Sequence, residues 1–136
     1  MVEVKKPVPE IDDESRPFFE AAKEGRLSIQ KCSSCGTFRF PPRLRCPSCL
    51  STDTQWTDVS GRGNVFTFGI WHQVFHPAFA DEAPYNVAVV ELEEGPHMVT
   101  SIVDCPNDSL RIGMPVQVVY TEPVDGVVLA KFKPVQ

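Results

Sequence analysis

The sequence predicts a mainly β protein with one short helix, and three features of the 136-residue chain predict it. Four of the five cysteines form two C-x-x-C pairs with ten residues between them, a spacing typical of a small metal-binding fold. Five β-type segments follow residue 61, separated by turn-forming sequences. A helical pattern is found at about residues 16–24. We therefore divide the chain into an N-terminal extension with the helix (1–25), a metal-binding part (26–60) and a β domain (61–136).

The helix is predicted from its boundary residues. Ser15 can cap the first turn with its side chain, Pro17 fits that turn, and Gly25 ends the helix. Its apolar face carries Phe18, Phe19 and Ala22. A helix of about two turns is marginal by itself, so this face must dock on the rest of the chain or on a partner.

The cysteine pairs are Cys32–Cys35 and Cys46–Cys49. A tight turn places both sulfurs of a pair on one side, and two facing turns complete a tetrahedral cage for one metal ion. Gly36, after the first pair, tolerates a positive φ, whereas Leu50 makes the second turn less comfortably. Four thiolates leave no open position for water, so the metal is expected to be structural.

The alternatives at these four cysteines are a disulfide pair, a thioredoxin-like redox pair and rubredoxin-type iron. The regular spacing and the absence of secretion signals disfavour disulfides, and a redox pair needs one motif rather than two facing ones. Tetrathiolate ligation suits both iron and zinc, and we predict one structural zinc ion per chain. The fifth cysteine, Cys105, has no motif around it and is expected to be a small buried or half-buried hydrophobe.

Alternating segments beside the cysteines predict a rubredoxin-like zinc ribbon with strands at about 27–31, 37–40 and 55–57. Further strands are expected at about 64–73, 85–92, 97–104, 114–122 and 127–134, with a helical turn or loop at 106–113. This order matches the five-stranded OB-fold barrel. Gly69, inside the long first strand, would allow that strand to bend between the two halves of the barrel.

The charge is uneven along the chain. The formal net charge is −5 and the pI is near 5.1, which argues against non-specific nucleic-acid binding because that binding requires phosphate neutralisation. Residues 26–49 contain five basic residues and no acidic one, while the remainder has 8 basic against 18 acidic residues. No apolar run approaches the ~20 residues of a membrane span, and no secretion signal is visible. We therefore expect a cytoplasmic protein without membrane contact.

The connection between the first two predicted barrel strands is long and aromatic. Long loops inside compact domains are usually functional. Phe75, His76 and Phe79 are therefore candidates for contact with a partner. The alternative is that the two phenylalanines pack over the open end of the barrel.

The chain resembles the acyl-CoA-associated zinc-ribbon/OB-fold protein family over about residues 16–134. The matching motifs are Pro17-Phe18-Phe19, Cys32-x-x-Cys35-Gly36, Phe38-Arg39-Phe40-Pro41-Pro42-Arg43, Cys46-Pro47-x-Cys49, Ser60-Gly61-Arg62-Gly63, Pro84-Tyr85 and Leu110-Arg111-Ile112-Gly113-Met114-Pro115-Val116. The combination is specific, although no single motif is. Leu50 stands where a glycine is common, which bears on the geometry of that turn rather than on the identity of the metal.

The resemblance implies a subunit without catalytic residues of its own. Members of this family are non-catalytic partners of thiolase-like enzymes that make or break carbon–carbon bonds on acyl-CoA substrates, and some accompany hotdog-fold enoyl-CoA hydratases. The expected function is an accessory subunit of a thiolase-like aldolase or acyltransferase complex, needed for assembly or activity of the partner and able to contribute to CoA binding. The sequence itself supports the absence of catalytic residues in one respect: His72, His76 and His97 show neither metal-site nor catalytic-triad spacing.

Five residues of the ribbon are candidates for contact with CoA or with the partner. Arg39, Arg43 and Arg45 could bind CoA phosphates or an acidic protein surface, because guanidinium groups pair with phosphates and carboxylates. The alternative is that they solvate a small ribbon whose sulfurs carry negative charge. Phe38 and Phe40 are candidates beside them, with the ribbon core as the alternative.

Three other function classes stay open. A nucleic-acid module is one, because zinc ribbons and OB-folds both occur there, but residues 64–134 contain three cations against nine acids, the wrong sign for a phosphate groove. An iron-loaded electron carrier would be red, which a colourless zinc-loaded sample would exclude. A free-standing enzyme would need catalytic residues that the sequence does not show.

Overall fold

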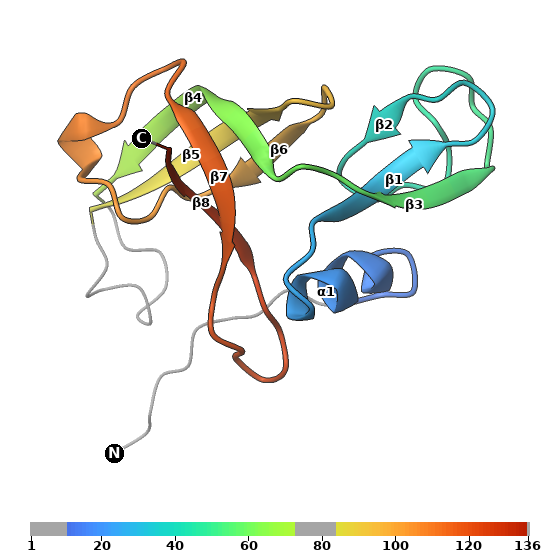
Figure 1. The fold of residues 1–136 in the computed structure, drawn as a ribbon, viewed down its shortest axis with the longest axis horizontal. Coiled ribbons are helices and arrows are strands. Elements are labelled where there is room, and N and C mark those ends of the chain that lie inside the picture. Colours follow the sequence, from blue (N-terminus) through green and yellow to red (C-terminus); the bar gives the residue numbers. More distant parts are fainter. Residues whose placement is uncertain (1–10, 73–83, 136) are drawn as a thin grey trace.

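The computed structural model describes residues 11–72 and 84–135, and Figure 1 shows two β-sheets side by side with one helix beneath the smaller sheet. The elements are α1 (Arg16–Lys23), β1 (Ser28–Cys32), β2 (Phe38–Arg39), β3 (Thr54–Asp58), β4 (Arg62–Trp71), β5 (Tyr85–Leu92), β6 (His97–Thr100), β7 (Pro115–Tyr120) and β8 (Ala130–Pro134). The smaller sheet has the order β2-β1-β3 and the larger one β6-β5-β4-β7-β8. All paired strands within these sheets are antiparallel. The predicted mainly β class is confirmed.

The helix is found as predicted, but its first turn is closed differently. Ser15 makes no side-chain capping bond to α1. Instead, the Ser15 N–H donates to Asp12 Oδ1 at 2.8 Å and the Asp12 N–H donates to Ser15 Oγ at 3.2 Å, a reciprocal pair that closes the turn before the helix. Ser15 therefore occupies the predicted N-cap position, but its side chain bonds to Asp12 instead of capping α1. Gly25 follows the helix with a φ of +76°, as expected for its end.

The apolar face of α1 docks on this chain. Phe18 is 8% exposed, and its ring centroid lies 5.2 Å from that of Phe19 and 5.3 Å from that of Phe40. It shares one buried cluster with Leu27 and Ile29 of the ribbon. With eight residues, α1 is far shorter than the ~20 residues needed to cross a bilayer, and the structure describes no longer helix.

The smaller sheet is the predicted ribbon. β1 pairs with β3 over its whole length, from Ser28 opposite Asp58 to Cys32 opposite Thr54. β2 has two residues rather than the expected four, and Gln30 of β1 lies opposite Arg39 of β2. It ends there because the two prolines that follow Phe40 have no N–H to continue the ladder.

The larger sheet contains the five predicted OB-fold strands, but within the described residues they are not closed into a barrel. Beyond the end of β6, Ile102 forms one isolated parallel bridge to Phe132 of β8, and the Val103 N–H donates to the Phe132 carbonyl at 2.8 Å. β6 ends at Thr100 rather than near residue 104, because the side chain of Asn86 in β5, rather than the β5 backbone, bonds the backbone beyond that point. This side chain donates to the Ile102 carbonyl at 2.9 Å and accepts from the Ile102 N–H at 2.7 Å.

The long strand β4 is irregular at Phe66 rather than at the glycine. The register against β5 shifts between Val65 and Thr67, which leaves Phe66 as the extra residue of a β-bulge. Gly69 lies opposite Val87 inside a regular stretch of the ladder. Because a bulge bends a strand, the bend predicted at Gly69 belongs to Phe66 instead.

One buried cluster joins the helix, the ribbon and the OB-fold. Its members are Phe18, Leu27, Ile29, Val65, Ala88, Val90, Leu92, Met98, Ile102, Leu110, Met114, Val116 and Phe132. A 3₁₀ turn at Asn107–Ser109 fills the predicted connection before β7. The shared core fixes the ribbon next to the larger sheet and so positions the cysteines on one side of the molecule.

Candidate metal centre and the ribbon surface

The four predicted ligands come from two equivalent turns. Cys32 ends β1 and Cys46 lies in the loop between β2 and β3. In each turn, the backbone N–H of this first cysteine donates to the carbonyl of the residue five positions later in the chain. The backbone carbonyl of the same cysteine accepts from the N–H of the residue four positions later, and all four bonds are 2.9 Å long. The second cysteine of each pair, Cys35 or Cys49, lies inside the turn so formed. The repeated C-x-x-C spacing therefore produces the same backbone geometry twice.

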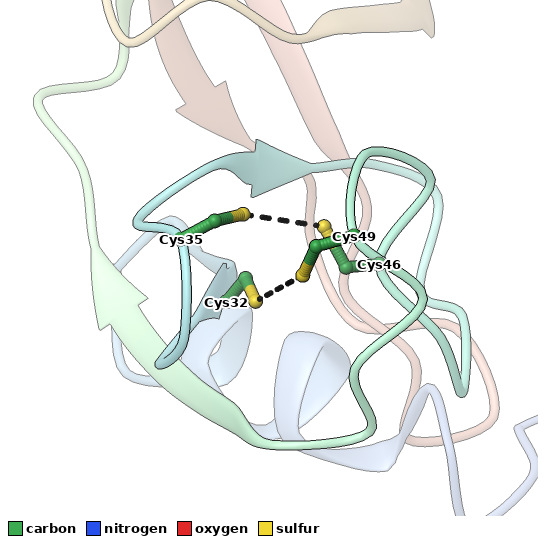
Figure 2. A group of neighbouring side chains, drawn as sticks. All are labelled: Cys32, Cys35, Cys46 and Cys49. Carbon is green, nitrogen blue, oxygen red and sulfur yellow. Dashed lines mark hydrogen bonds between the residues drawn. The ribbon is translucent and has the colours of Figure 1, made fainter.

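Figure 2 shows the four side chains pointing toward one another. The Sγ atoms all lie within 4.8 Å of each other, and the Cys32–Cys49 and Cys35–Cys46 pairs are both 3.6 Å apart. A regular tetrahedron with Zn–S bonds of about 2.3 Å needs sulfur–sulfur distances of about 3.8 Å. The four thiols fit one zinc ion, and because all four positions are filled by sulfur the site is closed and structural.

The two turns differ in the residue that follows each pair. Gly36 has a φ of +78° and Leu50 a φ of +65°, so both occupy the left-handed region. For a residue with a Cβ this conformation costs about 1–2 kcal/mol. The expectation that Leu50 makes its turn less comfortably than a glycine would is confirmed.

The thiols differ in acidity because their hydrogen-bond partners differ. The hydroxyl and the backbone N–H of Thr37 stabilise the Cys35 thiolate and lower the pKa of Cys35 to about 6. The Ser51 backbone N–H lowers the pKa of Cys49, but the neighbouring thiol of Cys32 opposes it, and the pKa rises to about 12. Zinc must displace the remaining protons when it binds, so metal affinity depends on pH.

Arg39 is placed inside the ribbon rather than at its surface. It is 3% exposed; its Nε and Nη2 atoms donate to the Arg43 carbonyl at 3.3 and 3.0 Å, and Nη2 also donates to Thr54 Oγ1. Its Nη1 is buried without a hydrogen-bond partner among the described residues. Four thiolates on one zinc ion leave a net negative charge in the same ribbon, which complements this buried cation. The position of Arg39 does not favour the predicted contact with CoA or a partner.

Gln30 completes a clamp with Arg39. The Arg43 N–H donates to Gln30 Oε1 at 2.7 Å, while the Arg43 carbonyl accepts from Arg39. Gln30 and Arg39 lie opposite each other on β1 and β2, and both are buried. Two buried polar side chains therefore hold both backbone polar groups of Arg43, three residues before Cys46.

The two phenylalanine candidates are half-buried against their own chain. Phe38 has the Lys31 Nζ 5.3 Å from its ring centroid. Phe40 contacts Phe18 and lines a shallow hollow between α1 and strands β6 and β8. These positions agree with the ribbon-core alternative, and a role in partner contact stays a prediction.

Four of the exposed residues in the second cysteine turn and its approach are arginines or leucines. Arg43 and Arg45 are exposed, and Arg45 Nη1 donates to the Leu50 carbonyl at 3.1 Å. Leu44 is 68% exposed and Leu50 65%. We call Arg43, Leu44, Arg45 and Leu50 the ribbon tip. Sequence reasoning missed the two leucines as surface residues, although Leu44 between two arginines and Leu50 in a glycine position were available signals.

The remaining candidates fall elsewhere. Phe75, His76 and Phe79 lie outside the described residues. His97 Nε2 lies 3.1 Å from Glu91 Oε2, and its ring centroid is 4.4 Å from that of Phe66. Within residues 11–72 and 84–135, the four cysteines are the one cluster of His, Cys, Asp and Glu side chains that could hold a metal ion.

The fold and the cysteine centre define a zinc-ribbon/OB-fold protein. Two family models match it: the rubredoxin-like zinc ribbon domain of ChsH2 over residues 19–55, and the C-terminal OB-fold domain of ChsH2 over residues 56–121. A DUF35 domain-containing scaffold protein of Methanocaldococcus jannaschii is 39% identical over 113 residues, which cover 78% of this chain and 79% of that protein. The chain belongs to this ChsH2-like DUF35 family.

Two further relatives were found. A probable enoyl-CoA hydratase alpha subunit of Thermomonospora curvata is 42% identical over 129 residues, 95% of this chain. This chain spans only 40% of that protein's length. A solved structure described as the Ltp2-ChsH2(DUF35) aldolase matches with a TM-score of 0.84 and 42% identity, over 93% of this chain and 98% of the solved chain.

Proposed function

We propose that this chain is a non-catalytic accessory subunit of a thiolase-like enzyme complex that acts on acyl-CoA substrates. The observation that carries the proposal is the match to the Ltp2-ChsH2(DUF35) aldolase chain, which covers nearly the whole length of both chains. The helix, ribbon and OB-fold therefore share one arrangement with a chain whose description pairs it with an aldolase. The scaffold name of the archaeal relative agrees with a subunit that assembles rather than catalyses.

The chemistry of the described residues supports a non-catalytic role. The zinc site is filled by four sulfurs and has no position for water or substrate. His97, an exposed titratable side chain, is paired with Glu91 rather than with a nucleophile. Under this proposal the partner supplies the catalytic residues, and this chain meets acyl-CoA through the complex.

The identity of further partners is a finer part of the same proposal. The name of the Thermomonospora curvata relative supports an enoyl-CoA hydratase as an additional partner, and this chain corresponds to less than half of that protein. A hotdog fold for this hydratase is proposed from the family resemblance alone. The catalytic part of such a hydratase would then lie outside the region shared with this chain. A cytoplasmic location is also proposed, because a four-thiolate site needs a reducing compartment.

The proposal is tested by co-expression with the thiolase-like enzymes encoded by the same organism. Complex formation is measured by size-exclusion chromatography with light scattering, and acyl-CoA turnover is assayed for each protein alone and for the pair. We expect a stable complex, no turnover by this chain alone, and higher activity or better assembly of the enzyme in the pair. A thiolase-like enzyme that is fully active and monodisperse without this chain would contradict the proposal.

A further inference from the structure

Leu50 of the ribbon tip adopts its conformation at a cost that the isolated chain does not recover. Leu50 adopts a left-handed φ of +65° where the equivalent turn uses Gly36, and its side chain remains 65% exposed. Leu44, six residues earlier, is 68% exposed. A leucine in a strained conformation normally recovers this cost by burial, and here little burial is available within the chain.

The backbone beneath these side chains is held rigidly. Gln30 and Arg39 hold the N–H and the carbonyl of Arg43, and the Arg45 guanidinium holds the Leu50 carbonyl. The zinc ligand Cys46 lies directly after this segment. A surface segment fixed on several sides loses little conformational entropy when a partner covers it, which is a property of good binding surfaces.

The charge of the ribbon is concentrated at the same place. Of the five basic residues in 26–49, Arg26 is paired with Glu24 and Asp58 at 2.7 Å, Arg39 is buried, and Lys31 lies over the ring of Phe38. Two exposed cations therefore remain, and both belong to the ribbon tip, where residues 41–50 contain no acid. Exposed leucines and exposed arginines within one cysteine turn and its approach complement an apolar hollow with an acidic rim.

We propose that the ribbon tip, formed by Arg43, Leu44, Arg45 and Leu50, docks into an apolar hollow with an acidic rim on the catalytic partner protein. This inference rests on the proposed function and names the surface that makes the contact. Leu44 and Leu50 fill the hollow, and the two guanidinium groups bind carboxylates at its rim. If the ribbon tip bound CoA phosphates instead, only the two arginines would make contacts, and both leucines would stay exposed to solvent.

The experiment measures the affinity of the zinc-loaded chain for the co-purified thiolase-like enzyme by isothermal titration calorimetry. The apolar variant is Leu44→Asn with Leu50→Asn, because asparagine tolerates the left-handed region and keeps the turn. Its matched control is Ile112→Asn, at a side chain that is 69% exposed on a loop of the OB-fold. The charge variant is Arg43→Glu, with Arg111→Glu as its control. Zinc content and melting temperature are checked for every variant.

We expect the double leucine variant to weaken binding by at least about 30-fold and the control variants by less than about 3-fold. We expect Arg43→Glu to slow association and to reduce its dependence on salt. Unchanged affinity of the tip variants, with wild-type binding intact, overturns this inference and leaves the proposed function standing. A raised KM for acyl-CoA with unchanged partner affinity also overturns it, in favour of a CoA contact. A wild-type chain that binds no thiolase-like enzyme overturns both.

Discussion

Removal of the zinc ion should unfold the ribbon and leave the OB-fold in place. The perturbation is a chelator in the presence of a reducing agent, so that the four thiols stay reduced and no disulfide replaces the metal. The ribbon strands β1, β2 and β3 are connected by the two cysteine turns, whereas the larger sheet contains no ligand. The effect of chelation should therefore be confined to one part of the chain.

The expected size of the effect follows from the small apolar content of the ribbon. Apart from the cysteines, its buried hydrophobic side chains are Leu27 and Ile29, which together contribute about 3–6 kcal/mol. Binding of a structural zinc ion contributes about 10–16 kcal/mol. This exceeds the whole stability of many small domains, about 5–15 kcal/mol. The metal, rather than apolar packing, is the main stabilising contribution in this part of the protein.

The assay is amide hydrogen exchange followed by mass spectrometry on zinc-loaded and chelated protein. We expect β1 and β3 to lose protection after chelation, while β4 and β5 keep it. A Cys105→Ser variant is the control, because this thiol is not among the four ligands and its loss should leave zinc content at one ion per chain. Protection of β1 and β3 that persists without metal would refute the reasoning, because packing alone would then hold the ribbon.

Three substitutions test other parts of the account by thermal or chemical unfolding. Gly36→Ala should destabilise the zinc-loaded chain by about 1–2 kcal/mol, because its φ is +78° and its Cβ would meet no neighbouring atom. Gly63→Ala should cost about 1–3 kcal/mol, because its Cβ would overlap the carbonyl of Glu91. Asn86→Ala should cost about 2–4 kcal/mol, because two backbone groups beyond β6 lose their buried hydrogen bonds.

Gly69→Ala is the control for the glycine variants, because a Cβ there meets only one atom, at 3.9 Å, and φ is not positive. It should leave the free energy of unfolding unchanged or raise it slightly. Equal losses at Gly36 and Gly69 would show that backbone conformation is not the cause at Gly36. For Asn86, a loss no larger than that of an exposed asparagine would contradict a structural role for its two hydrogen bonds to Ile102.

The features that depend on local sequence could be predicted from the chain alone. The C-x-x-C spacing defines the turn geometry at each cysteine pair, so the metal centre follows without knowledge of the tertiary fold. The strands of the OB-fold follow from alternating apolar residues and from the turns between them. The helix end at Gly25 follows from the freedom of glycine at positive φ.

The features that depend on contacts with residues distant in the sequence could not be predicted from the chain alone. Arg39 was expected at the surface because it is charged, and its burial depends on the Arg43 carbonyl and Thr54, which the fold brings to it. The bulge at Phe66 depends on the register of β5 against β4, which the sequence of a single strand does not contain. The Asp12–Ser15 pair was missed because serine at a helix start is normally read as the cap itself.

Native mass spectrometry of the complex purified through this chain tests the central claim most directly. The chain carries the tag, the source organism's thiolase-like enzyme is co-expressed, and the complex is measured before and after a high-salt wash. We predict a species that contains the thiolase-like enzyme and this chain in a fixed ratio, with one zinc ion per copy of this chain. A chain that emerges alone, or with nucleic acid retained through the wash, would contradict the account.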